Sequence, residues 1–141
     1  MSLALADFPI LNSSLSDDLQ NVTYHEDHNI GIATDTPHGL LVPNIKGVQN
    51  LSLLEIAQEL NRLHQAGLNN KLGPADIKGG TFSLSNIGAI GGTYAKPVIL
   101  SPQVAIGAIG KIIRFSTKKL HFLPKFRFLA KLSILNQNFD F

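Results

Sequence analysis

The chain has 141 residues, enough for one domain that buries roughly two-thirds of its unfolded surface. Its 44% hydrophobic and 16% charged residues exclude the composition of a disordered protein. The absence of cysteine excludes a disulfide scaffold, a thiolate nucleophile and a Cys-ligated zinc site. No apolar run reaches about 18 residues, so no transmembrane helix is predicted, and we expect no signal peptide at the N-terminus.

The net charge of +2 conceals two parts of opposite sign. Residues 1–110 contain five basic and nine acidic residues, a net charge of −4, whereas residues 111–141 contain seven basic residues and one acidic residue, a net charge of +6. Six of the eight Phe residues also lie in the second part. This asymmetry divides the chain into a body, residues 1–111, and a basic Phe-rich tail, residues 112–141.

The tail has two interpretations. Its apolar residues form no clean helical stripe and Pro124 interrupts the middle, so we expect the tail to be non-native to the domain or disordered, and to pack poorly. Its richness in Phe, Lys, Ile, Leu and Asn is typical of translated AT-rich non-coding DNA. The alternative is a basic, aromatic patch for a membrane surface or nucleic acid. The first interpretation, which we favour, predicts neither partner.

The first half of the body predicts short extended segments. Alternating apolar and polar residues favour strands at residues 8–10, 20–24, 29–34 and 40–45. Residues 35–39 are dense in turn formers. Pro43 cannot donate a ladder hydrogen bond, so it confines the last of these strands to a sheet edge or to its own end.

Residues 52–66 form the strongest helical pattern. Ser52 is a suitable N-cap, and Glu55 three residues later completes a capping box. Gly67 is the expected end of the helix. Helical spacing places one apolar face on Leu53, Ile56, Ala57, Leu60 and Leu63.

After this helix, Pro74 and Asp76 predict one short helical turn, and residues 81–85 and 104–109 predict two further strands. Strands on both sides of one strong helix are typical of an α+β layer fold.

Two patterns suggest a phosphate-binding site and a metal site, but neither has the residues or the geometry that such a site needs. Residues 105–111 resemble a phosphate-binding loop, yet Ala105 stands where that motif needs glycine and Ile112 where it needs Ser or Thr. His25 and His28 are three residues apart in an extended segment, where they point to opposite faces. We therefore predict no metal site.

Residues 79–93 are the most informative segment. A strand brings Ser85 and Asn86 into a loop that contains Gly88, Gly91 and Gly92. By itself this pattern favours a strand followed by a flexible turn. The functional alternative is a loop that brings its backbone and hydroxyl groups close to a ligand.

Several stretches together resemble the catalytic domain of the 2-oxo acid dehydrogenase acyltransferases, and most of all its branched-chain members. They read Phe-Pro-Ile-Leu-Asn, His-Asn-Ile-Gly-Ile-Ala, Gly-Leu-Leu-Val-Pro-Asn, Gly-Gly-Thr-Phe-Ser-Leu-Ser-Asn-Ile-Gly and Ala-Lys-Pro-Val-Ile. The resemblance extends over about residues 2–111, and chance does not produce so many ordered matches.

This resemblance implies a chloramphenicol-acetyltransferase-like fold, a mixed sheet with flanking helices. It implies acyl transfer between dihydrolipoyl groups and coenzyme A, with Ser85 as the donor to the oxyanion and with Asn86 and Gly88 binding the cofactor. It further implies trimers of like subunits with a site between chains, other 2-oxo acid dehydrogenase components as partners, a lipoyl group carried by another domain, and the mitochondrial matrix.

The chain departs from the family at the general base. The family places a histidine in a His-x-x-x-Asp-Gly motif, but no histidine here is followed by Asp four residues later. The resemblance stops just after Gly110, so we expect an incomplete fold and little activity from the chain alone. The alternative is an inactive assembly or regulatory fragment that inserts into acyltransferase trimers.

Overall fold

The computed structural model describes residues 1–91, 97–111, 113–115, 125–127 and 130–134, and it describes side chains as far as Lys111. Its helices are α1 (Ser2–Asp7), the 3-10 helices η1 (Pro9–Asn12) and η2 (Val48–Asn50), α2 (Leu53–Leu68) and α3 (Pro74–Ile77). Its strands are β1 (Ser13–Leu15), β2 (Val22–Tyr24), β3 (Ile30–Ile32), β4 (Thr34–Thr36), β5 (Gly39–Leu41), β6 (Asn44–Ile45), β7 (Phe82–Asn86), β8 (Ala105–Ile109), β9 (Ile113–Phe115), β10 (Lys125–Arg127) and β11 (Ala130–Ile134). None of the described helices is both long and apolar enough to cross a membrane.

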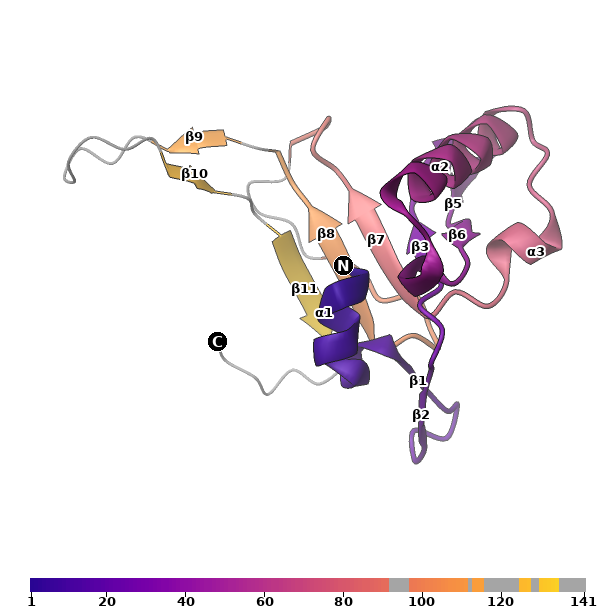
Figure 1. Cartoon of the computed structure of the whole chain (residues 1–141), viewed down its shortest axis with the longest axis vertical. Helices are drawn as coiled ribbons and strands as arrows, with labels where there is room; N and C mark the ends of the chain where they lie inside the picture. Colours follow the sequence, from indigo (N-terminus) through magenta and orange to yellow (C-terminus); the bar gives the residue numbers. More distant parts are fainter. Residues whose placement is uncertain (92–96, 112, 116–124, 128–129, 135–141) are drawn as a thin grey trace.

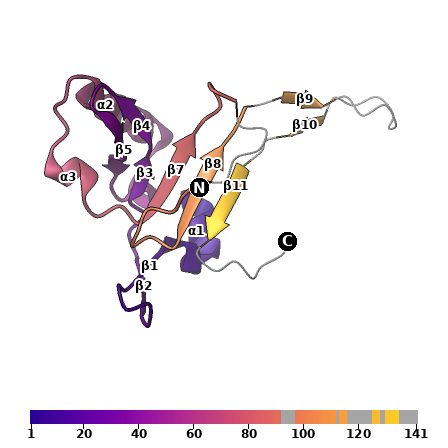
Figure 2. The same cartoon turned by 180° about the vertical axis from the view of Figure 1, so that it is seen from behind.

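A mixed five-stranded sheet with the order β11-β8-β7-β3-β6 forms the centre of the molecule (Figure 1). Strands β3, β7 and β8 run parallel, and the outer strands β6 and β11 are antiparallel to their neighbours. The pairs β1–β2, β4–β5 and β9–β10 form separate two-stranded ribbons. Two opposite views place α1 and α2 on the same face of the large sheet (Figures 1 and 2). We call this the helix face. Among the described residues, the opposite face carries no helix.

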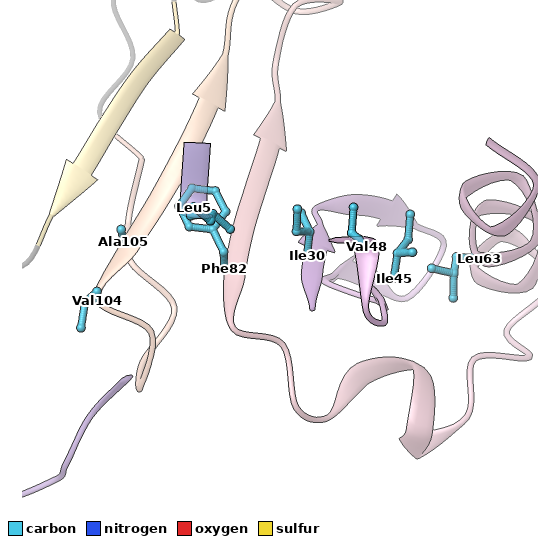
Figure 3. Packing of buried hydrophobic residues seen from close by; sticks show 8 residues of the cluster. All are labelled: Leu5, Ile30, Ile45, Val48, Leu63, Phe82, Val104 and Ala105. Atoms are coloured by element: carbon cyan, nitrogen blue, oxygen red, sulfur yellow. The ribbon is translucent and has the colours of Figure 1, made fainter. Parts of the chain in front are cut away.

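The hydrophobic core lies between the sheet and the two helices (Figure 3). Leu5 of α1 packs near Phe82 of β7, and both side chains are almost completely buried. Leu63 of α2 lies over Ile45 of β6 in the same cluster. The sheet therefore joins two packing centres, one beneath each helix.

The predicted helix exists, but its end differs from the prediction. Ser52 accepts a hydrogen bond from the Glu55 amide and Glu55 bonds back to Ser52, so the capping box is confirmed. The helix passes through Gly67 and ends at Leu68. Gly67 is buried, and a Cβ there would lie 3.5 Å from a methyl group of Thr36. The glycine therefore permits close packing rather than ending the helix.

Two other expectations need correction, and one helix was missed. Residues 8–10 are not a strand, because Pro9 opens a 3-10 helix whose first position needs no amide donor. The predicted strand 40–45 is split into β5 and β6 around Pro43, which cannot donate to a ladder. Helix α1 was not predicted at all, since six residues with one buried side chain carry no periodic signal.

Part of the tail has a described backbone. Strand β11 pairs with β8 over five residues, from Ala130 opposite Ile109 to Ile134 opposite Ala105. The packing of the six tail Phe side chains lies outside the described residues, so the prediction of poor packing stays a prediction, as does the domain boundary at residue 111.

Candidate functional site

The carboxyl end of β7 occupies the middle of the parallel part of the sheet. Ser85 pairs with Ala108 of β8, and Asn86 pairs with Ile109. Because β3, β7 and β8 are parallel, their carboxyl ends meet at one edge of the sheet. Ser85 and Asn86 lie at this edge.

Alternation along β7 sends its two serines to the face opposite the helices. Phe82 is buried beneath Leu5 on the helix face. The Ser83 hydroxyl points the other way and donates to Oε1 of Gln103 at 2.7 Å. Side chains two residues apart share a face of a strand, so Ser85 lies beside Ser83, where it is partly exposed. The Ser85 hydroxyl is therefore accessible from the side that carries no described helix.

Gln103, which the sequence did not single out, links β7 to β8. Its side chain is 4% exposed, and its Nε2 donates to the carbonyl of Gly80 at 3.1 Å. Together with the bond from Ser83, this ties the first half of β7 to the segment just before β8. A buried amide nearly always has hydrogen-bond partners, but nothing in the local pattern predicts that Gln103 is buried.

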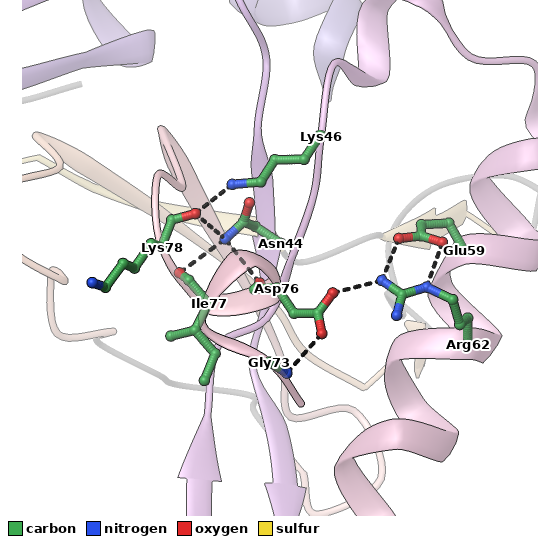
Figure 4. Close-up of polar contacts among 8 residues, drawn as sticks. All are labelled: Asn44, Lys46, Glu59, Arg62, Gly73, Asp76, Ile77 and Lys78. Atoms are coloured by element: carbon green, nitrogen blue, oxygen red, sulfur yellow. Dashed lines mark hydrogen bonds and ion pairs between the residues drawn. The ribbon is translucent and has the colours of Figure 1, made fainter. Parts of the chain in front are cut away.

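A second amide anchors the segment that leads into β7 (Figure 4). Asn44 is buried, and its Nδ2 donates to the carbonyls of Asp76 at 3.1 Å, Ile77 at 3.0 Å and Lys78 at 3.3 Å. The Lys46 ammonium also donates to the Lys78 carbonyl. These bonds hold the end of α3 against β6, and with it the start of the chain segment that carries Ser85.

The loop after β7 is shaped by its own backbone and by Asn86. The Oδ1 of Asn86 accepts a hydrogen bond from the Gly88 amide at 3.0 Å, and the Ile87 amide donates to the Ile109 carbonyl at 2.9 Å. A Cβ at Gly88 would lie 3.2 Å from the Gly110 carbonyl oxygen. The structure thus brings the predicted residues Ser85, Asn86 and Gly88 into one local turn.

In the described part of the chain, neither His25 nor His28 makes a hydrogen bond to the turn that contains Ser85, Asn86 and Gly88. His28 is buried, with its Nδ1 2.7 Å from the Ser2 hydroxyl, and Nε2 of His25 lies 3.0 Å from the Ser14 hydroxyl. Both rings are thus engaged near the N-terminus. Within the described ranges, no group of three or more His, Asp or Glu side chains could hold a metal ion.

The salt bridges of the described residues centre on Arg62 of α2, and one of them joins α2 to α3 (Figure 4). Arg62 pairs with Glu59 and with Asp76, each at 2.7 Å. The hydrogen bond from the Arg62 guanidinium lowers the pKa of both carboxyl groups, and the Gly73 amide lowers the pKa of Asp76 further. The two carboxylates in turn raise the pKa of Arg62.

A shallow cavity of about 520 Å³ lies beside these ion pairs, and it is lined by Lys46, Leu51, Glu55, Gln58, Glu59 and Arg62. Its two cations are already bound to acceptors of the protein itself. Ser85, Asn86 and Gly88 are not among the lining residues, so this cavity is separate from the turn that contains them.

Three comparisons identify what the chain resembles. The family described as 2-oxoacid dehydrogenases acyltransferase (catalytic domain) matches residues 1–123. The chain is 63% identical over 111 residues to the mitochondrial lipoamide acyltransferase component of the branched-chain alpha-keto acid dehydrogenase complex of Mus musculus. This match covers 79% of the chain and 23% of the relative, so the chain spans about a quarter of that protein's length.

Two solved structures share the fold. One was determined to examine a serine, a histidine and an asparagine in the catalytic mechanism of the Azotobacter vinelandii dihydrolipoamide acetyltransferase. The other is the cubic core of the pyruvate dehydrogenase multienzyme complex. Each is 35% identical with a TM-score of 0.87, and each match covers 94% of this chain and 55% of the solved one. The predicted fold of a mixed sheet with flanking helices is thereby confirmed. The chain belongs to the family of 2-oxoacid dehydrogenase acyltransferase catalytic domains.

Proposed function

We propose that the chain contributes the oxyanion-stabilising serine of a dihydrolipoyl acyltransferase, and that this serine is Ser85. The position of Ser85 carries the proposal: it is partly exposed at the carboxyl end of the central strand, on the face that bears no described helix. The reaction is acyl transfer between dihydrolipoyl groups and coenzyme A within a 2-oxo acid dehydrogenase complex.

The chemistry needs one donor at the place where charge develops. When the thiol of coenzyme A attacks the thioester of an acyl-dihydrolipoyl group, it loses its proton to a base and the carbonyl oxygen becomes an oxyanion. The Ser85 hydroxyl donates a hydrogen bond to that oxyanion and keeps its proton. The intermediate then releases the dihydrolipoyl thiolate, which regains a proton. Removal of one such donor commonly costs a factor of about 10²–10³ in rate.

The base comes from another subunit in this proposal. None of the five histidines in these 141 residues begins a His-x-x-x-Asp-Gly motif, and both His25 and His28 are engaged by serine hydroxyls. A base commonly supplies a factor of about 10²–10⁴ in rate. The 141-residue polypeptide alone should therefore turn over poorly.

The partners and substrates follow from the same reasoning. Like subunits supply the base across a trimer interface, and the lipoyl group comes on another domain. In this proposal Asn86 and Gly88 contact coenzyme A, and their turn next to Ser85 supports that role. Identity of 63% over 111 residues to the branched-chain relative, against 44% over 112 residues to the dihydrolipoyllysine-residue acetyltransferase component of Bacillus subtilis, supports a branched-chain acyl group and the mitochondrial matrix.

A complementation assay tests this function. The chain is mixed and refolded with the full-length mouse relative whose corresponding serine is replaced by alanine, and acyl transfer to coenzyme A is measured. Mixed assemblies should recover activity, Ser85→Ala should abolish the recovery, and the exposed Ser101→Ala should leave it unchanged. Equal recovery with Ser85→Ala would refute the role of Ser85.

The lack of a base motif also favours a second function, that of an inactive assembly fragment. The same assay separates the two functions: mixed assemblies that form without any recovered activity would support the second.

A further inference from the structure

The direction of the Ser85 hydroxyl depends on the backbone of β7. Among the described residues, no hydrogen bond reaches this hydroxyl, so no partner fixes the side chain directly. The backbone at Ser85 pairs with Ala108 of β8, whose side chain is buried. A small shift of β7 along β8 would therefore carry the hydroxyl with it. Misplacing a reacting group by about 1 Å can cost a factor of about 10² in rate.

Two side-chain hydrogen bonds hold the start of β7 in register with β8. The Ser83 hydroxyl donates to Oε1 of Gln103, and Nε2 of Gln103 donates to the Gly80 carbonyl. We call these two bonds the β7 clamp. Gln103 comes two residues before β8, so both bonds oppose sliding between the two parallel strands. Ser83 lies about 6.6 Å from Ser85 along the same face of the strand, so the clamp acts on the nearest neighbour of Ser85 on that face.

Gln103 is itself anchored by a third segment of the chain, β1. Its backbone forms an antiparallel bridge with Ser14, and next to this bridge the Leu15 amide donates to the Pro102 carbonyl at 2.9 Å. The Gln103 side chain therefore extends from a backbone that β1 already holds. A side chain on a fixed backbone can hold β7 in place, whereas one on a loose loop would follow β7 as it moved.

The strand on the other side of β7 leaves room for the Ser83 hydroxyl. Gly31 of β3 pairs with Ser83, and a Cβ at Gly31 would lie 3.3 Å from the Ser83 hydroxyl oxygen and 2.8 Å from Cγ1 of Val42. A side chain at this position would crowd the hydroxyl, and glycine does not. The clamp therefore combines a close approach on the β3 side with a hydrogen-bond partner on the β8 side.

We propose that Gln103 is a positioning residue for acyl transfer, which through the β7 clamp holds the Ser85 hydroxyl where the oxyanion forms. Gln103 bonds at the start of β7 and Ser85 lies near its end, so Gln103 acts through the strand and not on the substrate. This inference rests on the proposed role of Ser85 and deepens it. The oxyanion exists only during the reaction, so loss of the clamp should lower kcat and leave KM for coenzyme A unchanged.

Steady-state kinetics in the complementation assay test the role of Gln103. Mixed assemblies are purified, and each rate is divided by the amount of this chain that they contain. Gln103→Met has a similar size but makes neither hydrogen bond, so it should lower kcat about tenfold, with KM for coenzyme A changed by less than about twofold. Leu63→Ala is the control for lost stability, because Leu63 is buried beneath α2 on the helix face. Its kcat should stay within about twofold of the unsubstituted chain.

A pair of changes at Ser83 repeats the test with a milder substitution. Ser83→Ala removes the donor to Gln103 and should lower kcat by a factor of about three or more, with KM unchanged. Ser83→Thr keeps a hydroxyl donor and suits a strand, so it should retain at least about half of the kcat.

Three results would overturn the positioning role of Gln103. They are an unchanged kcat in Gln103→Met and Ser83→Ala, an equal fall in Leu63→Ala, and a fall in Ser83→Thr as large as that in Ser83→Ala. The proposed function fails separately, if Ser85→Ala leaves the recovered activity intact. If Ser85→Ala abolishes the recovery while Gln103→Met and Ser83→Ala keep the full kcat, only the positioning role fails.

Discussion

The two faces of the five-stranded sheet are stabilised by different interactions. On the helix face, Phe82 packs near Leu5, and the fit of apolar side chains decides stability. On the opposite face, Ser83 bonds to a buried Gln103 while its neighbour Ser85 is partly exposed. The same short strand thus serves as a core element on one side and carries a partly exposed serine on the other. Substitutions on the two faces should fail in different ways.

The largest effect is expected on the helix face. Phe82→Ala removes a completely buried ring and should lower the free energy of unfolding by about 3–5 kcal/mol. Leu53→Ala, at an exposed position of α2, should change it by less than about 0.5 kcal/mol. Urea denaturation of both variants measures the difference. Similar losses would mean that the exposed face of α2 around Leu53 is already covered in the isolated chain.

Gln103→Leu should have the next largest effect, and it acts through hydrogen bonds. The change leaves the Ser83 hydroxyl and the Gly80 carbonyl without their partner. The buried Ser83 hydroxyl should cost about 1–3 kcal/mol, and the Gly80 carbonyl only about 1 kcal/mol more because Gly80 is partly buried, so a total loss of about 2–4 kcal/mol is expected in the same denaturation experiment. A loss below about 1 kcal/mol would show that water replaces the amide.

The two serines of β7 should then separate stability from activity. Ser83→Ala leaves Oε1 of Gln103 without its donor and should cost about 1–3 kcal/mol of unfolding free energy. Ser85→Ala should cost less than about 0.5 kcal/mol, because its hydroxyl makes no hydrogen bond within the described residues, yet it should remove the catalytic rescue. Thermal melting of both variants, run beside the complementation assay, checks this. A large stability loss in Ser85→Ala would assign that serine to the scaffold.

The smallest effect concerns pH and the contact between α2 and α3. The pKa values of Asp76 and Glu59 are lowered in the folded state by hydrogen bonds from Arg62. A carboxyl group whose pKa is lowered by folding stabilises the fold at pH values above its pKa in the unfolded state. This stabilisation is lost as the pH falls through the pKa of the folded state. Stability should therefore decline below about pH 4, and Arg62→Met should flatten that decline. Arg62 is half exposed, so the effect should stay under about 1 kcal/mol.

Local patterns in the sequence were sufficient for elements with short-range causes. The Ser52–Glu55 capping box placed the start of α2, since both hydrogen bonds join residues three apart. Pro74 opens α3 as predicted, and residues 81–85 and 104–109 lie within one residue of β7 and β8. Family resemblance also located the Ser85 segment, because the run of matching residues is contiguous.

Tertiary contacts decided the features that depend on distant parts of the chain. Gly67 matched a helix end by type, but its approach to Thr36 keeps it inside the helix. Gln103 is a hub only because β8 brings it beside Ser83. The apolar face of α2 was correctly identified, yet which of its leucines are buried depends on where the sheet and α3 lie. Periodicity records which side of a helix is apolar, whereas burial is a property of the neighbours, and those neighbours are set by contacts between residues far apart in sequence.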